Sequence, residues 1–133
     1  MVNPPYYEAA GAWLEKADGD LRSAELLLSA EPPELDTAAF HCQQAGEKYL
    51  KAIMVYHGKN PPKIHDLEQL LDDLEYYTED TEQLREPAKI LTPFAVHLRY
   101  PFHGISPSEH DTRKALRMAQ KVGSFANTIV KPG

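Results

Sequence analysis

The stretch from Thr37 to Tyr56 constrains the fold most, because its apolar residues follow a helical repeat on two neighbouring rows. The first row holds Ala38, Cys42, Ala45, Tyr49, Ala52 and Tyr56, and the second holds Ala39, Gly46, Leu50 and Ile53. A helix with so wide an apolar arc must be covered on most sides. We therefore expect residues 37–56 to form the central helix of a bundle.

Single apolar stripes predict further helices on both sides of this segment. Spacings of three and four residues indicate helices at about 13–28, 65–76, 92–100 and 107–129, and the acidic stretch 79–86 is read as a short helix or ordered connection. No stretch alternates long enough to predict a strand. The predicted fold class is all-α, an antiparallel up-down bundle of about four main helices plus a short extra helix, in one domain over residues 1–133 with its core at about 13–130.

Helix starts are predicted from capping residues and prolines. Asp36 or Thr37 is expected to cap the central helix, and Asp66 lies favourably near the positive end of the next one. Thr92 resembles a cap followed by a proline at the first helical position. Ser106 begins a capping-box pattern with Pro107 and Glu109.

The bulk composition predicts a soluble cytoplasmic protein. The 133 residues are 42% apolar and 26% charged, and no apolar run approaches the roughly 20 residues that cross a membrane. The N-terminus lacks the pattern of a secretory signal, and the single Cys42 favours a reducing compartment. The histidines show no metal-ligand spacing and no glycine-rich phosphate loop is present, so neither a metal nor a cofactor is expected.

Charge is distributed unevenly along the chain. The net charge of −6 argues against coating of nucleic acid by bulk electrostatics. Residues 66–86 contain nine acidic side chains and one arginine, whereas residues 87–133 contain seven basic and two acidic side chains, a balance of 7 − 2 = +5. The C-terminal third is therefore the candidate for contact with an anionic partner.

Three ordered segments carry a resemblance to a known family. The central one reads Ala39-Phe40-His41-Cys42-Gln43-Gln44-Ala45-Gly46-Glu47-Lys48-Tyr49-Leu50-Lys51-Ala52, and it is similar to the second helix of the HEPN family. Residues 13–28 resemble that family's first helix, and His65-Asp66-Leu67 the start of its third. The resemblance implies a helical bundle that commonly forms a homodimer and associates with nucleotides or nucleic acid. Many small prokaryotic members are encoded beside a minimal nucleotidyltransferase, as toxin and antitoxin.

Some members of the family are metal-independent endoribonucleases with an arginine followed, after four to six residues, by a histidine. The nearest equivalent is Arg99 and His103, with three intervening residues that include Pro101. A histidine can accept the proton of a 2′-hydroxyl and an arginine can stabilise the charged phosphorane. Arg99 can equally close a helix C-terminus, and His97 or His110 are alternative partners for it.

Two further groups of cations are candidate contacts for RNA or nucleotide. Lys114, Arg117 and Lys121 fall on one face of the last predicted helix, which could also be a plain solvated face or bind the acidic stretch of a neighbouring subunit. His41, Lys48 and Lys51 share a polar stripe of the central helix with Gln44 and Glu47. That stripe is either the wall of a binding groove or the one remaining solvated face, with Glu47 and Lys51 as an i,i+4 pair.

The leading hypothesis is a HEPN protein that binds nucleotide or RNA as the toxin-like partner of a nucleotidyltransferase antitoxin, with a degenerate ribonuclease motif. The alternative is a non-catalytic HEPN module for dimerisation and partner docking.

Overall fold

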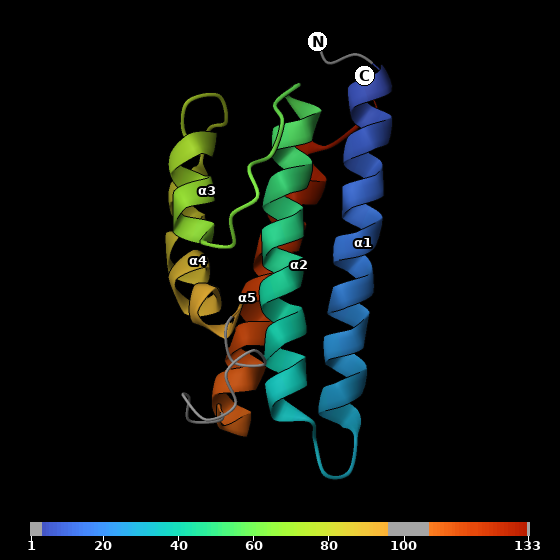
Figure 1. The fold of residues 1–133 in the computed structure, drawn as a ribbon, viewed down its shortest axis with the longest axis vertical. Coiled ribbons are helices and arrows are strands. Elements are labelled where there is room, and N and C mark those ends of the chain that lie inside the picture. The colour runs from blue at the N-terminus through green and yellow to red at the C-terminus, as the bar shows by residue number, and fades with distance from the viewer. Residues whose placement is uncertain (1–3, 96–106, 133) are drawn as a thin grey trace.

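The computed structural model describes residues 4–95 and 107–132, and within them every regular element is a helix (Figure 1). The elements are α1 (Pro4–Ser29), α2 (Leu35–Tyr56), α3 (Leu67–Leu74), η1 (Thr81–Leu84), α4 (Arg85–Leu91), η2 (Thr92–Ala95) and α5 (Glu109–Ile129), where η denotes a 3₁₀-helix. The predicted all-helical bundle is confirmed.

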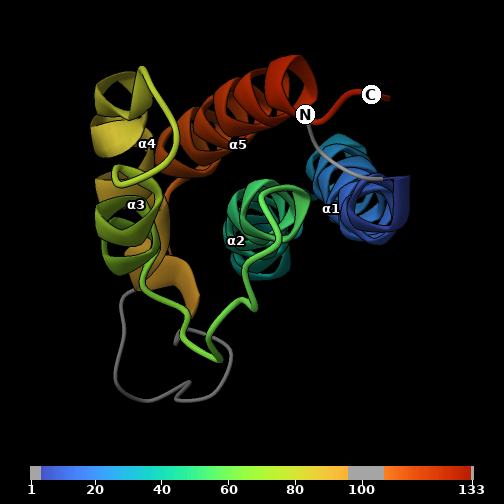
Figure 2. The same ribbon diagram turned by 90° about the horizontal axis from the view of Figure 1, so that it is seen from above.

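The helices are arranged around α2, which lies in the middle of the bundle when it is viewed from above (Figure 2). α1 and α2 form a long antiparallel hairpin, and the shorter α3 and α4 form a second antiparallel pair on the other side (Figure 1). α5 runs antiparallel to α1 and α4 and in the same direction as α2. Because α2 contacts α1, α3, α4 and α5, it needs apolar residues on most of its circumference.

The two apolar rows predicted for α2 are buried as expected. All their members are buried except Tyr56, which is half-buried. The single stripes of the outer helices also face inward. α1 contributes Ala17, Ala24 and Leu28, α3 contributes its four leucines, and α5 contributes Ala115, Ala119, Val122 and Ala126. The core therefore consists of one wide surface on α2 and the narrow stripes that cover it.

Several predicted caps are wrong in detail. α2 begins at Leu35, and Glu34 precedes it without a side-chain cap, so neither Asp36 nor Thr37 is the cap. Thr92 continues the helical backbone after α4. Its hydroxyl donates to the Ala88 carbonyl at 2.7 Å and accepts from the Leu67 amide at 3.1 Å, which ties the end of α4 to α3. Thr92 is the first residue of η2 and not a cap that precedes a helix.

The start of α5 lies later than predicted. Ser108 has the extended backbone of an N-cap, and its side chain accepts from the Asp111 amide at 3.0 Å. The predicted cap Ser106 lies outside the described residues. The placement of Asp66 was correct, since its carboxylate accepts from the Glu68 and Gln69 amides at the start of α3.

Candidate functional site

Lys114, Arg117 and Lys121 form a line of exposed cations on α5, which we call the basic ridge. The small residues Ala115 and Ala119 hold the opposite face of α5 against the core. The ridge spans eight residues, and its first and last Cα atoms are about 10 Å apart at the rise of an α-helix. None of its three cations forms an ion pair with a residue that the structure describes. The ridge is therefore an unneutralised positive surface on an acidic protein.

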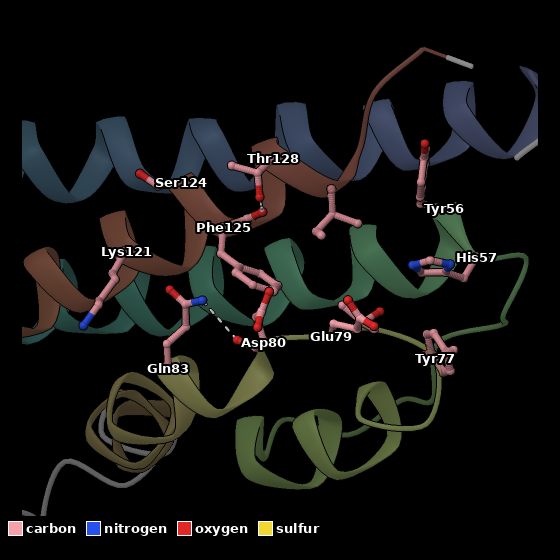
Figure 3. A pocket seen from close by; sticks show the side chains of 12 residues that line it. Tyr56, His57, Tyr77, Glu79, Asp80, Gln83, Lys121, Ser124, Phe125 and Thr128 are labelled. Carbon is pink, nitrogen blue, oxygen red and sulfur yellow. Dashed lines mark hydrogen bonds between the residues drawn. The ribbon is translucent and has the colours of Figure 1, made fainter. Parts of the chain in front are cut away.

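The basic ridge ends at a cavity of about 620 Å³, which we call the α5 cavity (Figure 3). The cavity lies between the second half of α5, the end of α2 and the segment from Tyr77 to Gln83. Its lining residues are Tyr56, His57, Tyr77, Thr78, Glu79, Asp80, Gln83, Lys121, Ser124, Phe125, Thr128 and Ile129. Its volume lies in the range of small-molecule sites.

The two ends of the α5 cavity differ chemically. Lys121 lies at one end, beside Gln83, and His57 and Tyr77 lie at the other (Figure 3). The rings of His57 and Tyr77 meet edge to face with centroids 5.1 Å apart, and Phe125 projects from α5 toward the segment that carries Asp80. A cationic end is thus joined to an aromatic end, and Glu79 and Asp80 lie between the two (Figure 3).

Two buried polar atoms beside the α5 cavity have no hydrogen-bond partner among the described residues, the Nε2 atom of His57 and the hydroxyl of Thr78. Thr78 is only 8% exposed, so water does not easily compensate for the missing bond. Burial, and then the nearby positive charge of Lys59, lower the pKa of His57 from its ordinary value. The imidazole is therefore mainly neutral at pH 7. In a neutral imidazole one ring nitrogen donates a hydrogen bond and the other accepts one.

The cations predicted on α2 separate into two groups that are paired inside the protein. His41 and Lys48 both reach Asp20 of α1, at 2.8 and 2.6 Å from the two carboxylate oxygens. Both side chains are about a quarter exposed. Together with Asp20, they tie α2 to α1.

Lys51 belongs to a second network, which is buried and does not include Asp20. Its ammonium lies 2.9 Å from Glu47, and Lys51 and Glu47 are 6% and 5% exposed. Glu47 also accepts from Gln43 at 3.0 Å and lies 3.0 Å from His65. The predicted pair of Glu47 and Lys51 is confirmed, but the reading of the whole stripe as a solvated face is wrong for these two residues.

Cys42 is buried in the first apolar row of α2. Burial, and then the negative charge of Glu25, raise the pKa of its thiol to about 12. A thiol with such a pKa stays protonated near neutral pH and is a poor nucleophile. Among residues 4–95 and 107–132 there is no group of three or more His, Cys, Asp or Glu side chains arranged to hold a metal.

The remaining predicted site residues, Arg99 and His103, lie outside the described residues. The structure brings together a set that the sequence did not suggest, since the α5 cavity is built from residues 56–57, 77–83 and 121–129. The only sequence signal was that Lys121 shares a helical face with Ser124 and Thr128. His57 and Thr78 carried no signal, because their unpaired atoms are a property of the packing.

The fold and the ridge define a helical bundle with a long central second helix and a line of cations on α5. A profile described as the HEPN domain matches residues 10–129. The chain belongs to the HEPN family.

Two solved structures are similar to this chain. TT1696 from Thermus thermophilus is 32% identical, with a TM-score of 0.79, over 90% of this chain and 96% of that one. ST0689, an archaeal HEPN homologue, is 21% identical, with a TM-score of 0.74, over 92% of this chain and 98% of that one. No curated protein matches the chain. In the described part, no helix has the length and apolarity needed to cross a membrane.

Proposed function

We propose that this HEPN protein binds RNA or nucleotide through the basic ridge of α5 and works as the toxin-like partner of a nucleotidyltransferase antitoxin. The observation that supports the proposal best is the ridge itself. Three exposed cations lie in line without neutralising partners among the described residues. Cations in such a line attract phosphates. When they neutralise the phosphates of a nucleic acid, the counterions bound to that nucleic acid are released.

The cations of α2 support the proposal less well than the ridge does. His41 and Lys48 share the carboxylate of Asp20, and Lys51 is buried against Glu47. A phosphate would have to displace a carboxylate to reach any of them, at a cost in free energy. The ridge is therefore the first contact for an anionic ligand, and the α2 cations mainly stabilise the fold.

We assign the catalytic step, within this proposal, to Arg99 and His103. The imidazole of His103 accepts the proton of a 2′-hydroxyl, whose oxygen attacks the adjacent phosphorus atom. The guanidinium of Arg99 stabilises the phosphorane as the P–O5′ bond breaks. The products are a 2′,3′-cyclic phosphate and a 5′-hydroxyl end, with the proton returned to the leaving oxygen.

Binding is tested with two matched triple variants. Lys114→Gln/Arg117→Gln/Lys121→Gln removes the ridge, and Lys16→Gln/Lys89→Gln/Lys131→Gln removes three exposed lysines elsewhere. Both lose the same net charge. Fluorescence anisotropy with a labelled single-stranded RNA is expected to show at least tenfold weaker binding for the ridge variant only. Equal weakening in both variants would mean that the ridge has no special role.

Cleavage is tested separately on the full chain. RNA cleavage that persists in EDTA and stops in both Arg99→Ala and His103→Ala supports the assigned step. RNA that stays intact at high protein concentration, while it still binds, would reduce the proposal to a binding function.

A second candidate function is a non-catalytic module for dimerisation and partner docking, favoured by the exposed side of α1. Leu26 is 71% exposed, and Ala9, Ala12 and Trp13 line a shallow hollow near the other end of the helix. Light scattering measures whether the 15.0 kDa chain doubles its mass. A dimer dissociated by Leu26→Glu or Ala12→Glu, with RNA binding absent in the native chain, supports this candidate over the first.

A further inference from the structure

We propose that the α5 cavity holds one nucleoside phosphate unit, with its phosphate on Lys121 and its base in the aromatic end. The inference rests on the proposed function, and it adds a reading of the base to the contact with the phosphate. The same unit can come from a free nucleotide or from an unpaired position in an RNA strand, and both sources present the same chemistry to the cavity.

The first argument is that the ridge and the cavity are continuous. Lys114, Arg117, Lys121, Ser124 and Thr128 follow spacings of three and four along α5, so they share one face of the helix. Lys121 belongs both to the ridge and to the cavity lining. A phosphate bound there places the attached sugar and base at the mouth of the cavity.

The second argument concerns the aromatic end. Tyr77 is half-buried and its ring already packs against His57, so it is held in place before any ligand arrives. Burial, and then the charge of Asp73, raise the pKa of Tyr77, so its ring stays neutral. A nucleobase stacks on such rings whatever its sequence, and stacking requires the base to be free of a duplex.

The third argument is the pair of unpaired buried atoms. The Thr78 hydroxyl and His57 Nε2 have no partner among the described residues, although both residues line the cavity. Both atoms are closed to solvent in this structure, so the two side chains must turn before the edge of a nucleobase can supply the missing hydrogen bonds. Glu79 and Asp80, which lie between Lys121 and Tyr77, add carboxylates that accept from the amino and ring N–H groups of a base (Figure 3).

The test compares single-stranded RNA, duplex RNA of the same length and the four nucleoside monophosphates, with ribose 5-phosphate as the probe that lacks a base. Thr78→Val and Tyr77→Leu alter the cavity, and Tyr76→Leu is the matched control because Tyr76 is 89% exposed. We expect the two cavity variants to bind single strands or monophosphates about tenfold more weakly, the value of one hydrogen bond or one stacked base. Duplex binding is expected to be unchanged.

Stability measurements keep the test valid. Thr78→Val removes an unsatisfied hydroxyl without changing the shape of the side chain, so its unfolding midpoint is expected to equal or exceed that of the native protein. Loss of binding in a variant of undiminished stability cannot be attributed to unfolding. A clear drop in the midpoint would show that the hydroxyl has a structural partner and would overturn the third argument.

The outcomes separate the inference from the proposed function. Equal binding of single-stranded and duplex RNA, weakened by the ridge variant but not by Thr78→Val or Tyr77→Leu, overturns the cavity and leaves the ridge. No binding of any RNA or nucleotide by the native chain overturns the proposed function as well. Monophosphates that bind better than ribose 5-phosphate, without binding of strands, support the cavity with free nucleotide as its source.

Discussion

Glu47 and Lys51 are adjacent charges inside a helix that is almost fully covered. Their i,i+4 spacing was visible in the sequence, but their burial was not, because it depends on how the chain after α2 folds back. His65 belongs to that returning segment and lies 3.0 Å from Glu47, while the Lys51 ammonium lies 6.0 Å from the centre of the Trp13 ring. A buried charge that keeps all its partners is tolerated, and one that loses a partner is not.

Replacing Lys51 with alanine is therefore expected to lower the free energy of unfolding by about 3 kcal/mol, because Glu47 stays buried without its main cation. Lys48→Ala is the matched control, with an expected loss of about 1 kcal/mol or less, since its partner Asp20 keeps His41 and is nearer to solvent. Urea denaturation measures both. Equal losses would show that burial of the Lys51 pair has no special weight.

His57 gives the protein a dependence of stability on pH. Its pKa is lowered in the folded state from the ordinary value of 6.5 by burial and by Lys59. Between the folded and the unfolded pKa the unfolded chain binds more protons, so the free energy of unfolding rises with pH up to about 6.5 and then levels. Thermal unfolding from pH 5 to pH 8 is expected to show a shallower acid-side decline in His57→Gln than in the native protein.

The exposed His110 offers a matched control for this experiment. His110→Gln is expected to keep the acid-side decline of the native protein. A decline that is the same in all three proteins would assign it to other groups.

At the scale of elements, two glycines set how closely the helices approach α2. A Cβ on Gly46 would lie 2.8 Å from Leu91 Cδ1 and 3.0 Å from Leu67 Cδ2, and one on Gly123 would lie 2.8 Å from Tyr49 Cζ. Real Cβ atoms do not approach other atoms so closely. These glycines let α3, α4 and α5 pack directly against α2.

Gly123→Ala is thus expected to destabilise the protein by about 1–3 kcal/mol, because the buried Tyr49 ring must move away from α5. Gly11→Ala is the control within another long helix, where the added Cβ meets nothing within 4 Å. It is expected to stabilise the protein by about 0.5–1 kcal/mol through helix propensity. Denaturant midpoints measure both, and changes of the same sign would contradict the packing argument.

The elements also show what the sequence could predict. Apolar stripes identified α1, α2, α3 and α5, because the spacing of apolar residues along a helix can be read from the sequence of that helix alone. The ends were less accurate, since Ser106, Ser108 and Thr92 all belong to residue types that favour caps, and tertiary contacts decide which one serves. The α5 cavity was not predictable, because its walls come from three segments that only the packing brings together.

The whole molecule has a net charge of −6, yet its basic ridge is the surface that we propose for RNA. The attraction between the ridge and an RNA strand must then act at short range. The acidic groups elsewhere repel the strand, and salt screens charges that are more than about 8–10 Å apart. Long-range steering of RNA is expected to be weak, and short-range contact with the ridge carries the affinity.

The salt dependence of binding tests this view. Three ridge cations that each neutralise one phosphate predict a slope of about −2 for log K against log salt with single-stranded RNA, at roughly 0.7 per contact. The ridge triple variant is expected to bring the slope close to zero. A slope of about −5 or steeper in the native protein would require many more cations than the ridge contains.

One face of α5 packs against the core and the opposite face is exposed, so the exposed face can be mutated independently of the packing. Mainly small buried residues together with Val122 and Phe125 hold it in the bundle, while the three cations lie exposed on the outward side. Residues 114, 117 and 121 can therefore be substituted while the protein keeps its fold. Substitutions on this one surface can change the ligand within a family that shares such a helix. A protein engineer can replace the same exposed residues as a set.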